Sequence, residues 1–270
     1  MLDEKILAVV GAGRIGESLI SALLKAGMRK TQIKASAAHE KRTRYIEKKF
    51  GIKTYLNNKE MVKDAQIVLL SVKPQNVLEV LNEIKDVVSG KLIITIAAGV
   101  PISFLEEKLG REVPIVRGMP NTPVLVREGM TVLCSNRKAS KKDLEIAREI
   151  FEAVGDVEIL EERLMDAVTG LSGSGPAYIY VVIEALAEAG VKVGIPRNVA
   201  TLLVAQTTLG SAKMVLKTKE HPAKLKDIVT TPAGCTIDGL LELEEGRLRN
   251  TLIKAVVKAT DRSRELLEER

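Results

Sequence analysis

Three glycines near the start of the chain, Gly11, Gly13 and Gly16, are spaced as G-x-G-x-x-G. They follow the apolar run 6–10 and precede a helical pattern that stops at Gly27. In such a strand–turn–helix unit, the first glycine permits the turn, the second lets the backbone approach a pyrophosphate, and the third lets helix and strand pack closely. The helix N-terminus adds free N–H groups that favour phosphates. A merely tight turn would use the same glycines, but the order of elements favours a dinucleotide site. The predicted loop comprises Gly11, Ala12, Gly13, Arg14, Ile15 and Gly16.

The residue that ends the second predicted strand bears on which dinucleotide is bound. An Asp or Glu about 20 positions after the glycines would accept a hydrogen bond from the ribose 2′-OH. Ser36 stands there instead, with Lys41 and Arg42 shortly after it. A hydroxyl and nearby cations suit a 2′-phosphate, so the sequence favours NADP over NAD. The alternative for the two cations is a solvated start of a helix.

A second loop with chemical character lies far along the chain, between two predicted helices. The helix that begins at Pro222 breaks at residues 230–232, and residues 233–235 lead into the next helix. Free N–H groups of a glycine-containing loop at a helix N-terminus form an anion site, which fits a substrate carboxylate. Thr236 either caps the helix or directs its hydroxyl at the substrate. The predicted substrate site comprises Thr231, Pro232, Ala233, Gly234, Cys235 and Thr236.

Alternating strand and helix patterns run up to about residue 160 and predict one doubly wound α/β domain over residues 1–160. The nearly all-apolar strand at 65–72 is typical of a sheet that is covered on both faces. The carboxyl ends of parallel strands meet at the edge where ligands bind. Small residues at one such end, Ala97, Ala98 and Gly99, suit a backbone that passes close to a cofactor. The expected strands are 6–10, 33–36, 53–56, 65–72, 92–97, 113–116, 131–134 and 157–160, with a Pro-rich loop at 117–123.

Residues 161–270 contain no convincing strand and predict an all-helical second domain. The helices expected at 177–187 and 199–209 are apolar on most of their circumference, as in helices buried in a bundle or at a subunit interface. A domain of this length has little interior to hide them, so we expect a homodimer through it. The glycine-rich segment 171–178 is interpreted as a break that permits close helix contact.

Composition argues against several classes of protein. The formal net charge is +6, but the basic residues are mixed with Glu throughout and form no patch with interleaved aromatics, which disfavours nucleic acid. Cys134 and Cys235 lie far apart and His occurs twice, which predicts neither a disulfide framework nor a metal site. The chain enters its first strand without a signal peptide. The most apolar helix, 177–186, contains Glu184 and is too short for a bilayer. We therefore expect a cytoplasmic protein with no metal, membrane or nucleic-acid partner.

Six motifs spread over the whole chain resemble the pyrroline-5-carboxylate reductase family. Many members have Ser-Ser where this chain has Thr230-Thr231, a Gly where it has Ala233, and an Arg soon after Ser36 where it has none. The segment 227–240 carries the most specific of the six motifs. The six are G-A-G-R-I-G at 11–16, S-V-K-P-Q at 71–75, A-A-G-V at 97–100, R-G-M-P-N-T-P at 117–123, L-S-G-S-G-P-A-Y at 171–178 and D-I-V-T-T-P-A-G-C-T-I-D-G-L at 227–240.

The resemblance implies reduction of 1-pyrroline-5-carboxylate to L-proline by hydride from NADPH, or NADH, as the last step of proline biosynthesis. It places Ser36 and Asn58 near the 2′-phosphate, the substrate carboxylate on residues 231–236, and the ring nitrogen at the hydroxyl of a catalytic Thr236. It also implies assembly of dimers into larger rings. The contacts that it implies around the nicotinamide are Ser71, Val72, Lys73, Pro74, Ala97, Ala98 and Gly99.

Two other functions stay open on the residues alone. A β-hydroxyacid-type NADP-dependent dehydrogenase shares the two-domain plan, but such enzymes commonly use a Lys on the first long helix of the second domain, and residues 171–190 contain none. A non-catalytic NADP-binding regulatory protein would need the glycine loop but not an anion-binding loop that ends in Thr236.

Overall fold

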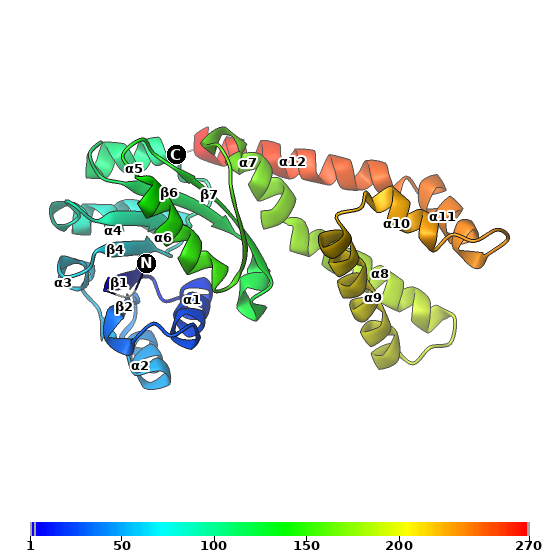
Figure 1. The fold of residues 1–270 in the computed structure, drawn as a ribbon, viewed down its shortest axis with the longest axis horizontal. Helices are drawn as coiled ribbons and strands as arrows, with labels where there is room; N and C mark the ends of the chain where they lie inside the picture. The colour runs from blue at the N-terminus through cyan, green and yellow to red at the C-terminus, as the bar shows by residue number, and fades with distance from the viewer. Residues whose placement is uncertain (1, 3, 269–270) are drawn as a thin grey trace. The chain divides into compact units, whose positions relative to one another are not determined.

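The computed structural model describes residue 2 and residues 4–268 of the chain (Figure 1). Its centre is an eight-stranded sheet in the order β3-β2-β1-β4-β5-β6-β7-β8. Neighbouring strands are parallel except for β6 and β7, which confirms the expected Rossmann-like, mostly parallel sheet. The strands are β1 Leu7–Val10, β2 Ile33–Ser36, β3 Lys53–Tyr55, β4 Ile67–Leu70, β5 Leu92–Thr95, β6 Ile115–Pro120, β7 Gly129–Ser135 and β8 Gly155–Ile159.

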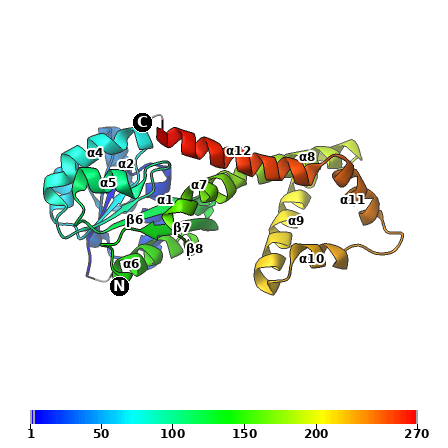
Figure 2. The same ribbon diagram turned by 90° about the horizontal axis from the view of Figure 1, so that it is seen from above.

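Helices cover both faces of this sheet, as the apolar strand at 65–72 predicts. Leu7 and Val9 lie in one hydrophobic cluster, while Ala8 and Val10 lie in the other. Helices α1, α2 and α6 contribute to the first cluster and α3, α4 and α5 to the second; Figure 2 shows α4 and α5 on one side of the sheet and α6 on the other. These helices are α1 Arg14–Lys25, α2 Glu40–Phe50, α3 Asn58–Lys63, α4 Val77–Ile84, α5 Ile102–Leu109 and α6 Lys141–Glu152.

Most of the expected Pro-rich loop at 117–123 is a strand, so that prediction was wrong. The antiparallel pairing of β6 with β7 runs from Val116 opposite Ser135 to Pro120 opposite Thr131. Pro120 is tolerated because it ends its strand and needs to donate no hydrogen bond there. The polar composition of the segment does not reveal the partner strand that follows it. After β6, the rest of the segment enters the short 3-10 helix η4. The 3-10 helices of the described chain are η1 Lys30–Gln32, η2 Pro74–Asn76, η3 Lys85–Val87, η4 Thr122–Val126 and η5 Glu162–Leu164.

The chain forms two compact units. Residues up to Gly173 and from Ala259 onward form unit 1, and Ser174–Lys258 form unit 2. Unit 1 therefore includes α7 (Met165–Val168), the π-helical turn η6 (Thr169–Gly173) and the end of the last helix. In that end, the Ser263 hydroxyl donates to Asp166 Oδ1 at 2.8 Å. The boundary after residue 160 stays a prediction.

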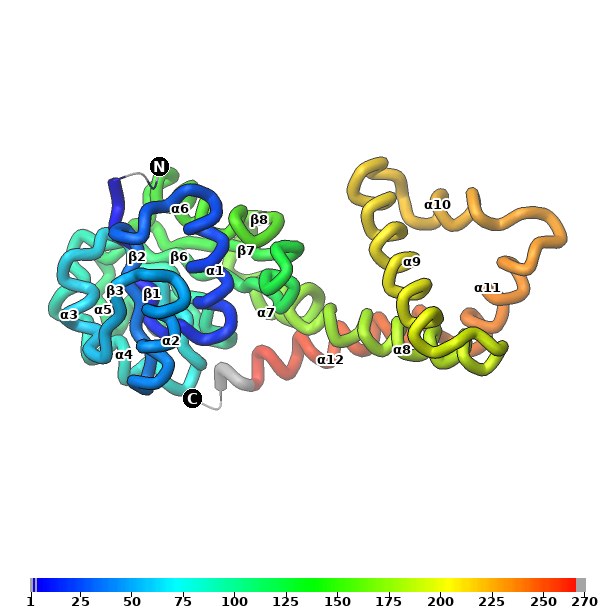
Figure 3. Tube along the Cα trace, turned by 90° about the horizontal axis from the view of Figure 1, so that it is seen from below, coloured from blue at the N-terminus to red at the C-terminus, as the bar shows by residue number. Residues whose placement is uncertain are grey.

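The described residues of unit 2 form helices and the loops that join them, and Figure 3 follows the trace from α8 to α11. Its two buried apolar side chains are Ala187 on α8 and Ala200 on α9. Many larger apolar side chains are exposed in the single chain, such as Leu202 at 68%. Its helices are α8 Gly175–Lys192, α9 Arg197–Thr218, α10 Pro222–Ile228, α11 Cys235–Glu245 and α12 Leu248–Glu268, whose end belongs to unit 1.

Helix α9 is long and apolar enough, by length and composition alone, to cross a bilayer. The expectation from the sequence that no helix spans a bilayer concerned residues 177–186, in α8, and did not cover α9. A helix that is apolar all round is also what a subunit interface requires, because a partner chain then covers the sides that its own unit leaves open.

Candidate active site

The predicted cofactor residues meet at one edge of the sheet because four parallel strands end in register. Val10, the last residue of β1, pairs with Ser36 on β2 and with Leu70 on β4. Leu70 in turn pairs with Thr95, the last residue of β5. The glycine loop, Ser36 and the segments after β4 and β5 therefore lie next to one another, at the edge where ligands bind in such sheets.

The glycine loop has the shape that its spacing predicts. Gly11 has φ +90°, and a Cβ there would lie 2.6 Å from Val72 Cγ1. A Cβ on Gly16 would lie 2.7 Å from the Gly11 carbonyl oxygen. A Cβ on Gly13 would meet nothing within 4 Å. The loop is thus closely packed behind Gly11 and Gly16 and open over Gly13, which fits the approach of a pyrophosphate.

The N-terminus of α1 is free to receive phosphate oxygens. Gly13 is the N-cap residue, and no side chain of the described protein caps this end of the helix. The N–H groups of Gly11 and Ala12 donate to the Ser36 carbonyl oxygen at 3.2 and 2.7 Å, which fixes the loop on β2. The first-turn N–H groups and the positive end of the helix dipole favour an anion at this point.

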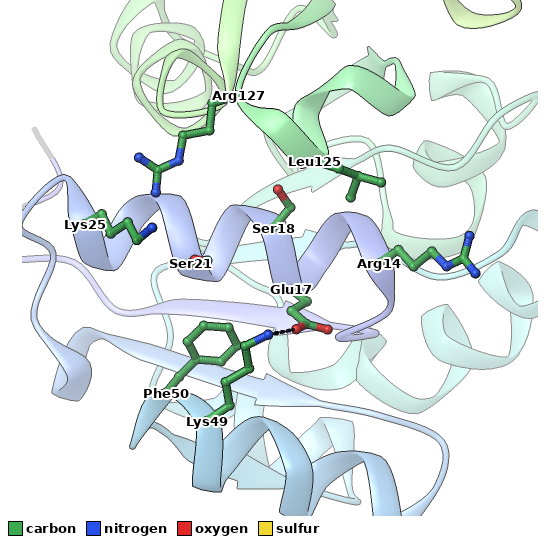
Figure 4. Close-up of a pocket in the computed structure, with 9 residues that line it drawn as sticks. All are labelled: Arg14, Glu17, Ser18, Ser21, Lys25, Lys49, Phe50, Leu125 and Arg127. Carbon is green, nitrogen blue, oxygen red and sulfur yellow. Dashed lines mark hydrogen bonds and ion pairs between the residues drawn. The ribbon is translucent and has the colours of Figure 1, made fainter. Parts of the chain in front are cut away.

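Arg42, one of the two cations expected near a 2′-phosphate, is bonded to the glycine loop and to α1. Its Nε donates to the Ala12 carbonyl oxygen at 2.8 Å, and its guanidinium also pairs with Glu17. Glu17 accepts a further hydrogen bond from Lys49 at 2.7 Å, which Figure 4 shows as a dashed line. Both residues line a cavity of about 340 Å³ over α1. Burial raises the pKa of Glu17, but the bonds from Lys49 and Arg42 outweigh it and hold this pKa below 4.5. Arg42 therefore braces the glycine loop, while Lys41 is exposed.

Ser36 and Asn58 contact each other directly. The Ser36 hydroxyl donates to Asn58 Oδ1 at 2.6 Å, and Ser36 is only 2% exposed. Asn58 begins α3 and is half-buried; Asn57 caps that helix by accepting from the Glu60 N–H at 2.9 Å. Glu83 on α4 accepts from the Asn58 side chain at 2.6 Å. Sequence reasoning missed Glu83, because nothing in a helical pattern indicates which polar residue will reach a loop far back along the chain.

A cavity of about 410 Å³ lies beside the ends of β4 and β5, where the nicotinamide contacts are predicted. Pro74 and Gly99 both line it, together with apolar residues that include Leu78 and Phe104. Gly99 is buried with φ +66°, a conformation that suits glycine. The two predicted segments thus border a single, largely apolar cavity in unit 1.

The predicted substrate loop lies in unit 2, at the N-terminus of α11. The N-cap residue is Gly234, whose N–H donates to the Thr231 carbonyl oxygen at 3.0 Å. A Cβ on Gly234 would lie 2.4 Å from Thr231 Oγ1, and Ala233 has a positive φ of 58°. Thr236 is half-buried and does not cap the helix, since no side chain of the described protein caps α11. The open N–H groups of this first turn and the Thr236 hydroxyl can serve an anionic ligand.

The cysteines differ in character, and both are free. Burial raises the pKa of the Cys134 thiol to about 12, Glu162 adds to this, and Arg117 opposes it. Cys235, in the substrate loop, is exposed. Among the described residues, no group of three or more His, Cys, Asp and Glu is placed to hold a metal ion.

Comparison with known proteins decides the family. Residues 6–99 match the model "NADP oxidoreductase coenzyme F420-dependent", and residues 162–266 match "Pyrroline-5-carboxylate reductase dimerisation". A pyrroline-5-carboxylate reductase of Methanosarcina acetivorans is 43% identical over 98% of this chain and 99% of its own length. The chain belongs to the pyrroline-5-carboxylate reductase family.

Solved structures of reductases in this family have the same fold over nearly the whole chain. The reductase of Coxiella burnetii has a TM-score of 0.93 at 35% identity and covers 98% of this chain and 99% of its own. That of Plasmodium falciparum, with NADP bound, has a TM-score of 0.88 at 35% identity, with the same coverage.

Family membership confirms the resemblance read from the six motifs. The dimerisation match includes α8 to α11 and most of α12, so it supports a homodimer formed by the reductase's helical part. This explains why the single chain leaves so many apolar side chains of unit 2 exposed. Neither the dehydrogenase alternative nor the regulatory alternative has comparable support.

Proposed function

We propose that this chain reduces 1-pyrroline-5-carboxylate to L-proline with hydride from NADPH or NADH, as the last step of proline biosynthesis in the cytoplasm. The observation that carries the proposal is the end-to-end similarity to reductases of that name, at 43% identity over 98% of the chain. The in-register strand ends support it, because they place the predicted cofactor residues at one edge of the sheet.

The cofactor site that we propose follows that edge. The N–H groups at the start of α1 hold the pyrophosphate over the open face of Gly13. Ser36 and Asn58 face the 2′ position of the adenosine ribose. The cavity beside Pro74 and Gly99 receives the nicotinamide half. The proposed cofactor residues are Gly11, Ala12, Gly13, Arg14, Ile15, Gly16, Ser36, Asn58, Ser71, Val72, Lys73, Pro74, Ala97, Ala98 and Gly99.

The substrate site that we propose is the loop of residues 231–236. When bound, the nicotinamide would supply the hydride, which the carbon of the cyclic C=N accepts readily when the ring nitrogen already carries the proton that the product amine keeps. The first-turn N–H groups of α11 bind the substrate carboxylate, and the positive end of the helix dipole strengthens this contact. The Thr236 hydroxyl bonds the ring nitrogen and orients the imine. The chain thus contributes position and electrostatics, without an acid–base pair of its own.

The assembly that we propose is a homodimer formed through residues 161–270. Several such dimers would associate into a larger ring. The helical part carries both the dimer interface and the substrate loop, and residues 1–160 carry the cofactor. We propose no metal, nucleic-acid or membrane partner; the apolar surface of α9 is assigned to the dimer.

The test measures the loss of NADPH absorbance when 1-pyrroline-5-carboxylate is added. In the control, a 2-hydroxy acid is added with NADP⁺, and its oxidation would appear as a gain of that absorbance. We expect Thr236→Ala to lower turnover about tenfold to a hundredfold, the scale of one well-placed hydrogen bond of roughly 1.5–3 kcal/mol. Thr236→Ser keeps the hydroxyl and should recover most of the rate. Wild-type turnover of the alanine variant at saturating NADPH would remove Thr236 from the mechanism, and oxidation of the 2-hydroxy acid alone would refute the reductase activity.

A further inference from the structure

The helix that follows the predicted nicotinamide segment is capped by a residue from far along the chain. Helix α5 begins at Ile102, and its N-cap residue is Pro101, which has no polar side chain to accept from the first N–H groups. Glu162 supplies the acceptor from 60 positions further on, since its Oε1 accepts from the Ile102 N–H at 2.7 Å. The start of α5 is therefore held by a side chain of η5, and both elements belong to unit 1.

Arg117 binds the same carboxylate oxygen from the sheet. It lies on β6, is only 4% exposed, and its Nη1 donates to Glu162 Oε1 at 3.1 Å. A buried guanidinium requires a charged partner, because an unpaired buried charge is costly. The side chain of Glu162 is 35% exposed, and the charge of Arg117 keeps it turned toward the protein. The two residues therefore connect the sheet to the first backbone N–H of α5.

The segment between β5 and α5 is fixed at its two ends rather than along its length. At the first end, the Ala97 N–H donates to Thr95 Oγ1 at 3.3 Å. At the second end, the Ile102 N–H donates to Glu162. Within the described structure, the backbone N–H groups of residues 98–100 make no hydrogen bond, so the course of the segment depends on these two anchors.

The same segment forms one wall of the cavity of about 410 Å³ that is assigned above to the nicotinamide half. Gly99, Val100 and Pro101 all line this cavity, together with Pro74 from the segment after β4. Because Pro101 directly precedes Ile102, a shift in the start of α5 moves this wall. A displacement of about 1 Å near a reacting group is enough to slow a reaction strongly.

We propose that Glu162, held by Arg117, is a positioning residue for the nicotinamide half of the cofactor. It fixes the start of α5 and thereby the cavity wall that residues 99–101 form. The proposal rests on the proposed function, because it takes the cofactor site as given. The adenosine half is assigned to the glycine loop and Ser36, which other hydrogen bonds hold in place. Its affinity should therefore not depend on Glu162.

The test is calorimetric titration of the dimeric protein with two ligands, NADPH and adenosine 2′,5′-bisphosphate, which lacks the nicotinamide half. We expect Glu162→Ala to weaken NADPH binding about tenfold and to change the bisphosphate affinity by less than about twofold. The kcat should fall as well, because a loosely held nicotinamide reaches the geometry of hydride transfer less often. Glu162→Gln keeps an oxygen that can accept from both Ile102 and Arg117, so it should recover most of the NADPH affinity.

Glu161→Ala is the matched control. Glu161 directly precedes Glu162, and its carboxylate accepts from Arg163 Nε at 2.6 Å, with both side chains 71% exposed. E161A therefore removes the same charge and one ion pair from the same turn, but this pair does not hold α5. Both affinities should stay within about twofold of wild type.

A second variant guards against misfolding, because E162A leaves the charge of Arg117 buried without its partner. Arg117→Met combined with Glu162→Ala removes both charges, and it should show the same selective loss of NADPH affinity. A merely structural role would weaken both ligands equally or neither, and either result would overturn the proposal. An equal loss of NADPH affinity in E161A would also overturn it. If the wild type binds neither ligand, the proposed function itself fails, and this proposal fails with it.

Discussion

The two units of the chain bury their apolar residues in different ways. Unit 1 covers both faces of its sheet with its own helices, and its exposed apolar side chains, such as Val126, are scattered. Unit 2 buries Ala187 and Ala200 but exposes larger side chains along α8, α9 and α11. Unit 1 therefore covers its core within one chain, while unit 2 leaves apolar surface for a second copy to cover, as the match to a dimerisation family indicates.

The largest effect should come from a charge on the exposed apolar surface of unit 2. Leu202 on α9 is 68% exposed in the single chain, and we assign it to the dimer interface. Leu202→Glu would bury an unpaired carboxylate there, and we expect the dimer to weaken roughly a thousandfold, about 4 kcal/mol. Sedimentation velocity across a concentration series measures this.

The matched control places the same charge on unit 1. Val126 in η4 is 72% exposed, and Val126→Glu should leave the sedimentation profile unchanged, since surface substitutions away from special features have small effects. A monomeric V126E protein, or a dimeric L202E protein, would break the distinction between the two units.

Within unit 1, two glycines of one loop should separate stability from binding. A Cβ at Gly11 would lie 2.6 Å from Val72 at a φ of +90°, so Gly11→Ala should cost about 2–3 kcal/mol of the free energy of unfolding. A Cβ at Gly13 meets nothing within 4 Å, so Gly13→Ala should cost only about 1 kcal/mol or less, the scale of a poorer N-cap. Its methyl group should weaken NADP affinity roughly tenfold or more. Thermal melts and titrations measure the two quantities; a G13A protein with wild-type affinity would place the pyrophosphate elsewhere.

Within unit 2, substitution of Gly234 should disturb the substrate loop, whereas substitution of its neighbour Ala233 should have little effect. Gly234→Ala would place a Cβ 2.4 Å from Thr231 Oγ1 and should raise KM for the substrate about tenfold, because the loop must shift. Ala233→Gly relieves a positive φ of 58° but adds freedom to the unfolded chain, so stability should change by less than about 1 kcal/mol. Steady-state kinetics on both variants would sharpen the comparison, and equal KM values would show that the loop does not bind the substrate.

The smallest effect concerns the brace behind the glycine loop. Because the pKa of Glu17 in the folded protein is below 4.5, its carboxylate stabilises the fold above that pH, and the contribution is lost as the pH falls through the lowered pKa. Glu17→Gln should cost about 1 kcal/mol near pH 7, and the difference from wild type should shrink below pH 4.5. Urea unfolding at several pH values measures this; a difference independent of pH would exclude the carboxylate as its cause.

The sequence predicts the parts of the site that are built from local patterns. The glycine spacing, the strand that ends at Ser36 and the helix that begins near Cys235 each depend on neighbours within a few residues, and the structure has all three. The apolar circumference of α9 likewise indicated a partner chain.

The sequence could not predict contacts between residues that only the fold brings together. Arg42 was expected near a 2′-phosphate but bonds the glycine loop, because α2 packs beside that loop. Glu83 approaches Asn58 only because α3 and α4 pack on the same face of the sheet. Strand β7 runs antiparallel because it pairs with β6. The polar segment between the two strands does not indicate that pairing.

The return of α12 to unit 1 has a consequence for synthesis of the protein. Thr260 and Ser263 are buried there, and Ser263 bonds Asp166, almost a hundred positions upstream. The helical unit is thus an insertion, with both of its ends joined to unit 1. A ribosome must translate the whole insertion before unit 1 receives the segment that follows it, so the nascent nucleotide-binding unit is completed only after unit 2 has been synthesised.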